Sequence, residues 1–311
     1  MKILHIGLCC QPPPINGMQQ AFADNSDYRE INCGEKDLNR KVIELSNSFT
    51  PDLIFMQIQT EGVIHRSTIV ELKKKGAFII NWTGDIRNQV PQWMIEIADV
   101  VDLTCFSNMR DVDWMKKHNY RSEYLEQGYD ENIYKPQGEA MAVPPIVYFA
   151  NNYNNQFPMG KFRIQMNDFL KDRFKKQYGI YGNGWNNANG NFNHSQPVEA
   201  SAYRGAKIAI NVSNYEVKQY SSDRIHRIMG TGTAICLAKH YQDIEKVYTD
   251  GVHLRVWEDL NDLEILINYY LRDGSNFERF GITKNGMELA QKNFTFQSMI
   301  KNIIALWEQK K

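Results

Sequence analysis

The sequence lacks any long apolar run, and no stretch approaches the roughly 20 consecutive apolar residues that a membrane-spanning helix needs. Residues 1–8 hold only a short apolar run, which predicts a first strand rather than the apolar part of a secretion signal. Net charge is also lacking, because 36 basic and 36 acidic side chains cancel, so the overall balance does not indicate a polyanionic partner. We therefore expect a cytoplasmic protein without a membrane span.

Two common site signatures are missing as well. The five cysteines have no metal-ligand spacing, and their odd number is typical of a reducing compartment. The loop after the first predicted strand lacks the GxGxxG fingerprint, which disfavours a dehydrogenase. Asn16 and Gly17 in this loop could open a helix whose free N–H groups meet a phosphate or a sugar hydroxyl. The alternative is an ordinary proline-stiffened turn capped by glycine, and the sequence leaves both open.

The pattern that is present is an alternation of short apolar runs with longer segments of helical period, which is typical of parallel sheets covered by helices. A chain of 311 residues is about twice the usual length of one domain. We predict strands at 2–8, 28–32, 53–57, 77–82, 101–106 and 122–126, and then at 146–150, 177–181, 207–212, 233–237 and 253–257. The proline- and glycine-containing stretch 134–145 between the two series predicts a linker between two α/β domains.

The most informative run lies in the second half. It is predicted to form a strand at 207–212, a polar loop, a helix opened by Ser222 and Asp223, a glycine turn and another strand. In open α/β sheets, ligands bind beyond the carboxyl ends of the strands, where helix N-termini carry free N–H groups and partial positive charge. This layout therefore offers a helix N-terminus to a pyrophosphate.

This run resembles the donor-binding core of GT-B glycosyltransferases, and specifically the group-1 transferases related to spore-maturation glycosyltransferase-like proteins. Residues 128–136 resemble that family's Gly-x-Asp-x-x-x-aromatic-x-Pro segment, and residues 148–185 resemble the opening of its second domain. The resemblance implies an α/β protein of the GT-B fold, with two Rossmann-like domains facing a central cleft. Residues 1–140 would form the acceptor domain, 141–292 the donor domain, and 293–311 a helix crossing back to the first domain.

The resemblance also assigns roles. Arg224 falls on the family's phosphate-contacting arginine, and the loop 218–222 falls where the diphosphate of the donor is held. Fixed cations and helix N–H groups can stabilise a departing nucleoside diphosphate without a metal ion or other cofactor. The predicted donor-binding residues are Gly17, Arg163, Tyr181, Asn183, Lys218, Ser221, Ser222, Asp223 and Arg227, with Arg224 as a catalytic residue. For Arg163 and Lys218, a solvated surface role remains an alternative.

The chain departs from the family at two positions. Arg227 stands where members usually carry the glutamate that accepts the ribose hydroxyls, and Gln219 replaces the acidic residue found eight positions before it in many retaining members. Both the ribose contact and the stereochemical course of transfer therefore stay open.

An inverting transferase needs a base for the acceptor hydroxyl, and loops after strands in the first half offer Asp85 and, less directly, Glu61 and His65. We favour Asp85 as the catalytic base, because it directly follows a strongly apolar strand; the alternative is an N-cap of the next helix. The pair Asp111 and Asp113 invites a metal site, but both acids lie at the start of a predicted helix, where they complement its dipole. We predict no metal ligands.

Together these features predict an enzyme that moves a sugar from a nucleoside-diphosphate sugar, such as a UDP-sugar, to a hydroxyl of an unidentified acceptor. The acceptor classes that remain are a glycan, a small molecule and a modified DNA base. One alternative is a DNA glycosyltransferase of the viral type, acting on a hydroxymethylated base. The other is a catalytically decayed sugar-nucleotide-binding protein, since both family acids are replaced.

Overall fold

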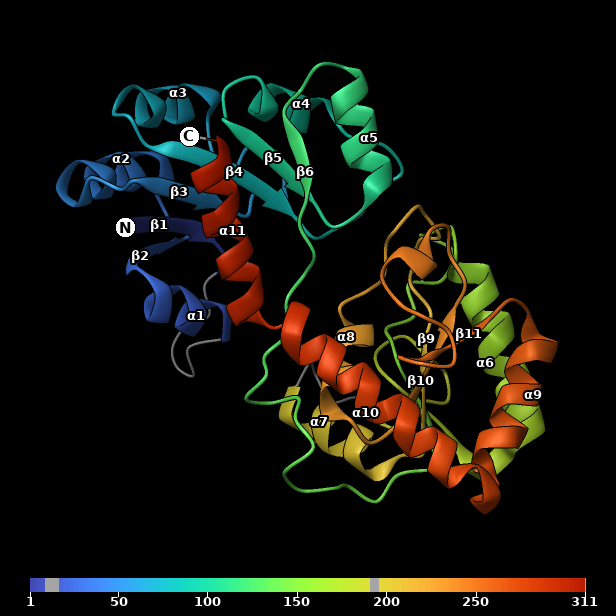
Figure 1. The fold of residues 1–311 in the computed structure, drawn as a ribbon. Coiled ribbons are helices and arrows are strands. Elements are labelled where there is room, and N and C mark those ends of the chain that lie inside the picture. The colour runs from blue at the N-terminus through green and yellow to red at the C-terminus, as the bar shows by residue number, and fades with distance from the viewer. Residues whose placement is uncertain (9–16, 191–195, 311) are drawn as a thin grey trace. The chain divides into compact units, whose positions relative to one another are not determined.

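The computed structural model describes residues 1–8, 17–190 and 196–310. The chain divides into two compact units, one comprising Met1–Gly128 with Phe296–Lys311 and the other comprising Tyr129–Thr295. Each unit holds one fully parallel sheet with helices on both faces (Figure 1). The predicted α/β class with two Rossmann-like domains is confirmed.

The first unit is built on a six-stranded sheet in the order β2-β1-β3-β4-β5-β6. Its strands are β1 (Lys2–Gly7), β2 (Asp27–Asn32), β3 (Leu53–Met56), β4 (Phe78–Thr83), β5 (Leu103–Phe106) and β6 (Ser122–Tyr124). Its helices are α1 (Gly17–Asn25), α2 (Leu38–Phe49), α3 (Arg66–Lys74), α4 (Gln92–Ala98), α5 (Met109–Lys117) and α11 (Phe296–Lys310).

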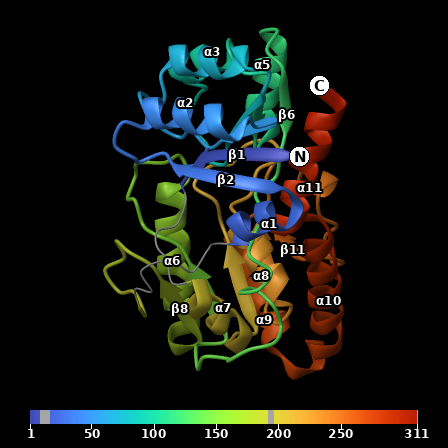
Figure 2. The ribbon, with the colours of Figure 1, turned by 90° about the vertical axis from the view of Figure 1, so that its left-hand side faces the viewer.

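Apolar side chains alternate between the two faces of this sheet. Leu4 packs with α2 and α3, whereas its neighbour Ile3 packs with α1 and α11. In Figure 2, α2 and α3 accordingly lie on one side of β1 and β2, and α1 lies on the other. α11 contributes Met299, Ile300 and Ile303 to this second face, so its apolar stripe completes the core of the first unit.

The second unit has a five-stranded sheet in the order β11-β10-β9-β7-β8. Its strands are β7 (Ile146–Phe149), β8 (Tyr178–Tyr181), β9 (Ile208–Asn211), β10 (Ile235–Lys239) and β11 (Arg255–Trp257). Its helices are α6 (Gly160–Phe174), α7 (Gln196–Gly205), α8 (Arg224–Thr231), α9 (Leu260–Leu271) and α10 (Asn276–Asn293). The chain runs outward in opposite directions from β7 and β9, so the topological switch point of this sheet lies between these two strands.

Each predicted strand corresponds to a strand of the structure, with ends shifted by no more than a few residues. The stretch 134–145, which was predicted to be a linker between the domains, differs more from its prediction. Residues 129–140 pack with the second unit, because the rings of Tyr129 and Tyr134 are buried in its core. The Met141 N–H then donates to the carbonyl of Ser201 on α7, so the proline- and glycine-containing segment runs along this unit.

His5 is a buried titratable residue in the middle of β1. Its Nδ1 lies 2.9 Å from the Tyr28 hydroxyl and its Nε2 lies 2.7 Å from Gln57 Oε1. Burial lowers the pKa of His5 to about 4, although the hydrogen bond with Gln57 and the nearby charge of Glu30 oppose this shift. The imidazole is therefore neutral in the folded protein at neutral pH.

We expect this histidine to make the protein acid-sensitive. Between pH 6.5 and about 4 the unfolded chain binds a proton at His5 and the folded chain does not. The free energy of unfolding should therefore fall by about 3 kcal/mol as the pH is lowered through this window. Urea unfolding at several pH values should show a shallower pH dependence for His5→Gln, but not for the exposed His65→Gln. Equal pH dependence in the wild type and His5→Gln would contradict this assignment.

Candidate functional site

The loop that follows β9 folds back onto the end of its own strand. The Ser222 hydroxyl donates to Asn211 Oδ1 at 2.9 Å, and the Ser222 N–H donates to the Ser213 hydroxyl, also at 2.9 Å. Gln219 adopts a left-handed conformation with φ of 49°, and its N–H donates to the Gln242 carbonyl in the loop after β10. These bonds fix the start of α8 at the carboxyl edge of the sheet, next to β9.

The start of α8 holds two buried polar atoms that lack a partner. Ser221 Oγ and Arg224 Nε have no hydrogen bond within the described residues, although both atoms are shielded from solvent. Buried polar atoms are nearly always paired, so an unpaired donor here indicates a ligand or water that completes the site. The N–H groups of Ile225, His226 and Arg227 donate to the backbone carbonyls of Ser222 and Asp223, but the N-terminus of the helix still carries partial positive charge. The arrangement suits an anion.

Arg224 keeps its charge at this position. Burial by itself would lower the pKa of the Arg224 guanidinium, but attraction by Asp223, Tyr148, Tyr203 and Glu199 outweighs burial, and the pKa is raised. A permanent cation therefore lies at the N-terminus of an α-helix in the second unit.

Arg163 joins the two loops on either side of the switch point. This side chain is only 3% exposed. Its Nη2 donates to the Asn151 carbonyl after β7 at 2.9 Å, its Nη1 donates to Asn214 Oδ1 after β9, and its Nε donates to the Tyr148 hydroxyl at 2.7 Å. The surface role considered for Arg163 is thus wrong, because its guanidinium is buried and bonded to both loops.

The loop after β8 packs closely against the end of β7. Gly182 has φ of +138°, and a Cβ there would lie 2.2 Å from the Ala150 carbonyl oxygen, so only glycine permits this approach. The Asn183 N–H then donates to Asn151 Oδ1 at 2.9 Å. Asn183 is an exposed residue at the carboxyl edge of the sheet. Tyr181, in contrast, is buried and stacks on Phe149, with ring centroids 4.7 Å apart.

The remaining predicted donor-binding residues lie in the same loop or in the other unit. Lys218 is half-buried and precedes the start of α8, as predicted for the loop 218–222. Gly17 is the first residue of α1 in the first unit, while Cys9, Cys10 and Asn16 of the preceding loop lie outside the described residues. The structure does not bring Gly17 and the α8 residues into one unit.

The position where the resemblance expects a glutamate holds Arg227, which belongs to a partly buried ion-pair network. Arg227 bonds to the Asp223 carboxylate and lies 3.1 Å from Glu199 Oε2, a residue of α7. Glu199 also accepts hydrogen bonds from the hydroxyls of Tyr134 and Tyr203, at 2.8 and 2.7 Å. Glu199 was not among the residues predicted from the sequence, although it is the one acid on a buried helix face otherwise made of alanine and tyrosine.

In the first unit, Asp85 follows β4 at the carboxyl edge of the sheet. Its side chain is exposed and has no hydrogen bond or ion pair within the described ranges, while its carbonyl accepts from Arg87 Nη1 at 3.2 Å. The next helix, α4, begins at Gln92 after Pro91, so Asp85 does not cap it. The N-cap alternative is therefore wrong, and a free carboxylate remains at the edge where ligands bind in such sheets.

Asp111 and Asp113 lie in the first turns of α5, as predicted. The Asp111 N–H donates to the side chain of Asn108, which caps this helix, and the Asp111 carboxylate pairs with Arg110 at 2.8 Å. Within the described ranges, no group of three or more His, Cys, Asp or Glu residues is arranged to hold a metal ion. No helix of these ranges combines the length and the apolar character of a membrane span.

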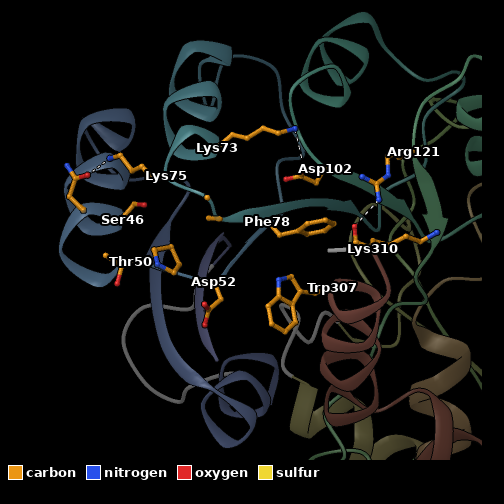
Figure 3. A pocket seen from close by; sticks show the side chains of 14 residues that line it. Ser46, Thr50, Asp52, Lys73, Lys75, Phe78, Asp102, Arg121, Trp307 and Lys310 are labelled. Atoms are coloured by element: carbon orange, nitrogen blue, oxygen red, sulfur yellow. Dashed lines mark hydrogen bonds and ion pairs between the residues drawn. The ribbon is translucent and has the colours of Figure 1, made fainter.

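A cavity of about 770 Å³ in the first unit lies at the opposite, amino-terminal edge of its sheet (Figure 3). Its cations are already engaged: Lys73 pairs with Asp102 at 3.0 Å, and Arg121 donates to the carbonyl of Lys310 at 3.1 Å. The last turns of α2, α3 and α11 border this cavity, and helix C-termini carry partial negative charge. This cavity is therefore less suited to a diphosphate than the start of α8.

Comparison with known proteins gives one family match and several similar folds. A family model described as glycosyl transferase-like matches residues 163–305. No curated protein matches this chain in sequence. Among solved structures, Anabaena HepE in complex with UDP has a TM-score of 0.63 and 12% identity, covering 99% of this chain and 100% of that one. Sucrose-phosphate synthase from Thermosynechococcus elongatus has a TM-score of 0.63 and 10% identity, covering 99% of each chain.

A glycosyltransferase from Rickettsia africae is similar as well, with a TM-score of 0.64 and 10% identity over 99% of this chain and 98% of that one. At these identities the structural likeness shows the fold, and the family model adds the glycosyl transferase-like character of residues 163–305. The predicted resemblance to GT-B glycosyltransferases is thereby confirmed. The chain has the GT-B fold, and its residues 163–305 match a glycosyl transferase-like family model.

Proposed function

We propose that the protein transfers a sugar from a UDP-sugar to an acceptor hydroxyl and holds the diphosphate of the donor at the start of α8. The observation that carries this proposal is the pair of buried, unpartnered atoms at that point, Ser221 Oγ and Arg224 Nε. A phosphate oxygen is an acceptor that can satisfy both of these donors, and the charge of Arg224 favours an anion over water.

The chemistry follows from charge. When the bond between the sugar and the diphosphate breaks, negative charge accumulates on the leaving diphosphate. Arg224 and the positive end of the α8 dipole would be fixed in place before the reaction, so they stabilise this charge without reorganising. This reasoning supports transfer without a metal ion. Uridine is the proposed base, because Anabaena HepE, which shares the fold, has been solved with UDP and with UDP-glucose.

The acceptor must lose a proton when its hydroxyl attacks the sugar. We assign this proton to Asp85, because its carboxylate is free within the described residues and lies at the ligand-binding edge of the first sheet. The structure gives no feature that favours a DNA base over a glycan or a small molecule as the acceptor. An assay for the acceptor must therefore include all three classes.

UDP should raise the melting temperature of the wild-type protein, whereas ADP and GDP should raise it less. A ligand at 100 times its Kd stabilises the folded state by about 2.7 kcal/mol. We expect the same rise in the presence of EDTA, and UDP release from UDP-sugars that also persists in EDTA. Differential scanning fluorimetry and a UDP-release assay with glycan, small-molecule and hydroxymethylated-DNA acceptors measure these effects.

Each outcome of these assays decides between the candidates. No shift with UDP would overturn the proposed donor, and a shift that EDTA abolishes would overturn metal independence. A UDP shift without UDP release for any acceptor would identify a sugar-nucleotide-binding protein without transferase activity. Release only with hydroxymethylated DNA would identify the DNA glycosyltransferase.

A further inference from the structure

Ser222 and Asp223 could both cap α8, but their side chains bond to other residues. The Ser222 hydroxyl donates to Asn211 Oδ1, and the Asp223 carboxylate bonds to Arg227, one turn further along the helix. Asp223 accordingly makes no capping hydrogen bond. Side chains of this kind usually cap a helix by accepting its first N–H groups. Here the N–H groups of Ile225, His226 and Arg227 donate to the backbone carbonyls of Ser222 and Asp223 instead, so no carboxylate lies at the start of α8.

Arg227 is itself held in place from a second helix. It lies 3.1 Å from Glu199 Oε2 on α7 and 5.5 Å above the ring of Tyr134. Burial would lower the pKa of Arg227, but Asp223 and Glu199 outweigh burial and raise it, so the guanidinium stays charged. Because Glu199 is anchored by the hydroxyls of Tyr134 and Tyr203, this network sets the position of Arg227 independently of any ligand.

We propose that Arg227 is a positioning residue that keeps the Asp223 carboxylate away from the anion site at the start of α8. The proposal rests on the proposed function, because the anion expected to bind at this site is the diphosphate of UDP. Arg227 acts by engaging and neutralising Asp223, and need not contact the donor. In this chain, the position at which the resemblance expects a ribose-binding glutamate would therefore serve the diphosphate.

The reasoning is a balance of charge. Arg224 and Arg227 balance Asp223 and Glu199, so the four groups together are neutral. Without the charge of Arg227 they carry a net charge of −1, and the released Asp223 carboxylate is free to pair with Arg224 or to cap α8. Arg224 already feels the charge of Asp223, which contributes to its raised pKa. A carboxylate in that place would compete with a phosphate for the same cation and repel it.

The test is a double-mutant cycle on the purified full chain. Isothermal titration calorimetry at fixed ionic strength would measure the Kd of UDP and of uridine for the wild type, Arg227→Gln, Asp223→Asn and the double variant. We expect Arg227→Gln to weaken UDP by at least about tenfold, as one unbalanced charge near a phosphate would do. Uridine, which has no phosphate, should bind all four proteins within about threefold of the wild type.

The decisive measurement is the UDP affinity of the double variant. Removing the Asp223 charge in the Arg227→Gln background should restore the UDP affinity to within about threefold of Asp223→Asn alone, because no carboxylate then remains to compete. A loss that persists in the double variant, or an equal loss for uridine, would mean that Arg227 only supports the fold, and would overturn the proposal.

A further variant keeps the proposal testable if Arg227→Gln does not fold. Arg227→Lys keeps the positive charge and should retain UDP affinity within about threefold, whereas a role that needs the guanidinium shape would fail in this variant too. If Arg227→Gln does not fold, the Arg227→Lys comparison alone decides, and a tenfold loss of UDP affinity in it overturns the proposal. Wild-type protein that does not bind UDP would refute the proposed function itself, whereas normal UDP binding by Arg227→Gln would refute only the role of Arg227.

Discussion

Replacing Arg224 by alanine should lower kcat/KM for a UDP-sugar by about 100- to 1,000-fold, the range typical when one preorganised donor to a developing negative charge is lost. Arg224 is the only side chain at the start of α8, within the described residues, that combines a fixed positive charge with a buried, unpartnered donor atom. The rise in melting temperature caused by UDP should shrink in the same variant, because the diphosphate loses its cation. Steady-state UDP release and thermal shifts measure the two effects.

Arg173→Ala is the matched control for this experiment. Arg173 lies on α6 of the same unit, but its side chain is 55% exposed and reaches Glu264 only at 3.7 Å. Exposed pairs of this kind contribute little to stability, so turnover and UDP binding should stay at wild-type levels. An Arg224→Ala protein that keeps wild-type kcat/KM would show that the diphosphate binds elsewhere.

Replacing Asp85 by asparagine should lower kcat by about 100- to 10,000-fold while leaving the Kd of UDP unchanged, since a general base acts on the acceptor and not on the donor. Asparagine keeps the size and polarity of the side chain and removes only its ability to take a proton. Single-turnover assays would give the rate of transfer, and calorimetry would give the affinity for UDP.

Glu61→Gln provides the comparison for Asp85. Glu61 is also an exposed acid in a loop after a strand of the first unit, so a nonspecific loss of negative charge would affect both variants equally. A loss of turnover in Glu61→Gln with normal turnover in Asp85→Asn would move the base to Glu61. A parallel loss of UDP affinity in Asp85→Asn would assign that residue to donor binding instead.

The strands were predictable because local sequence encodes them strongly. In β3, β7 and β9 every residue is buried, and buried parallel strands appear in sequence as unbroken apolar runs. α10 gave a much weaker signal, because its apolar residues do not form one stripe. The division into units was harder to place, since it depends on where Tyr129 and Tyr134 pack, which no local pattern reveals.

The site was predictable only in part, because the sequence pattern reveals local structure but not contacts between distant residues. Arg224 and the loop before it stand out because a strand, a polar loop and a helix N-terminus follow one another along the chain. Arg163 and Glu199 depend on contacts across the fold: the first bonds to loops after two strands, and the second pairs with Arg227 from the neighbouring helix. Such roles follow from tertiary packing rather than from residue spacing.

The placement of α11 has a consequence for how the protein is made. The first unit needs the apolar face of this helix, yet ribosomes synthesise α11 after the whole of the second unit. The N-terminal sheet must therefore wait during translation without the apolar side chains Met299, Ile300 and Ile303 on one of its faces, while the second unit already has its complete sequence and can fold. Chaperone demand during synthesis should thus come mainly from residues 1–128, although they emerge first.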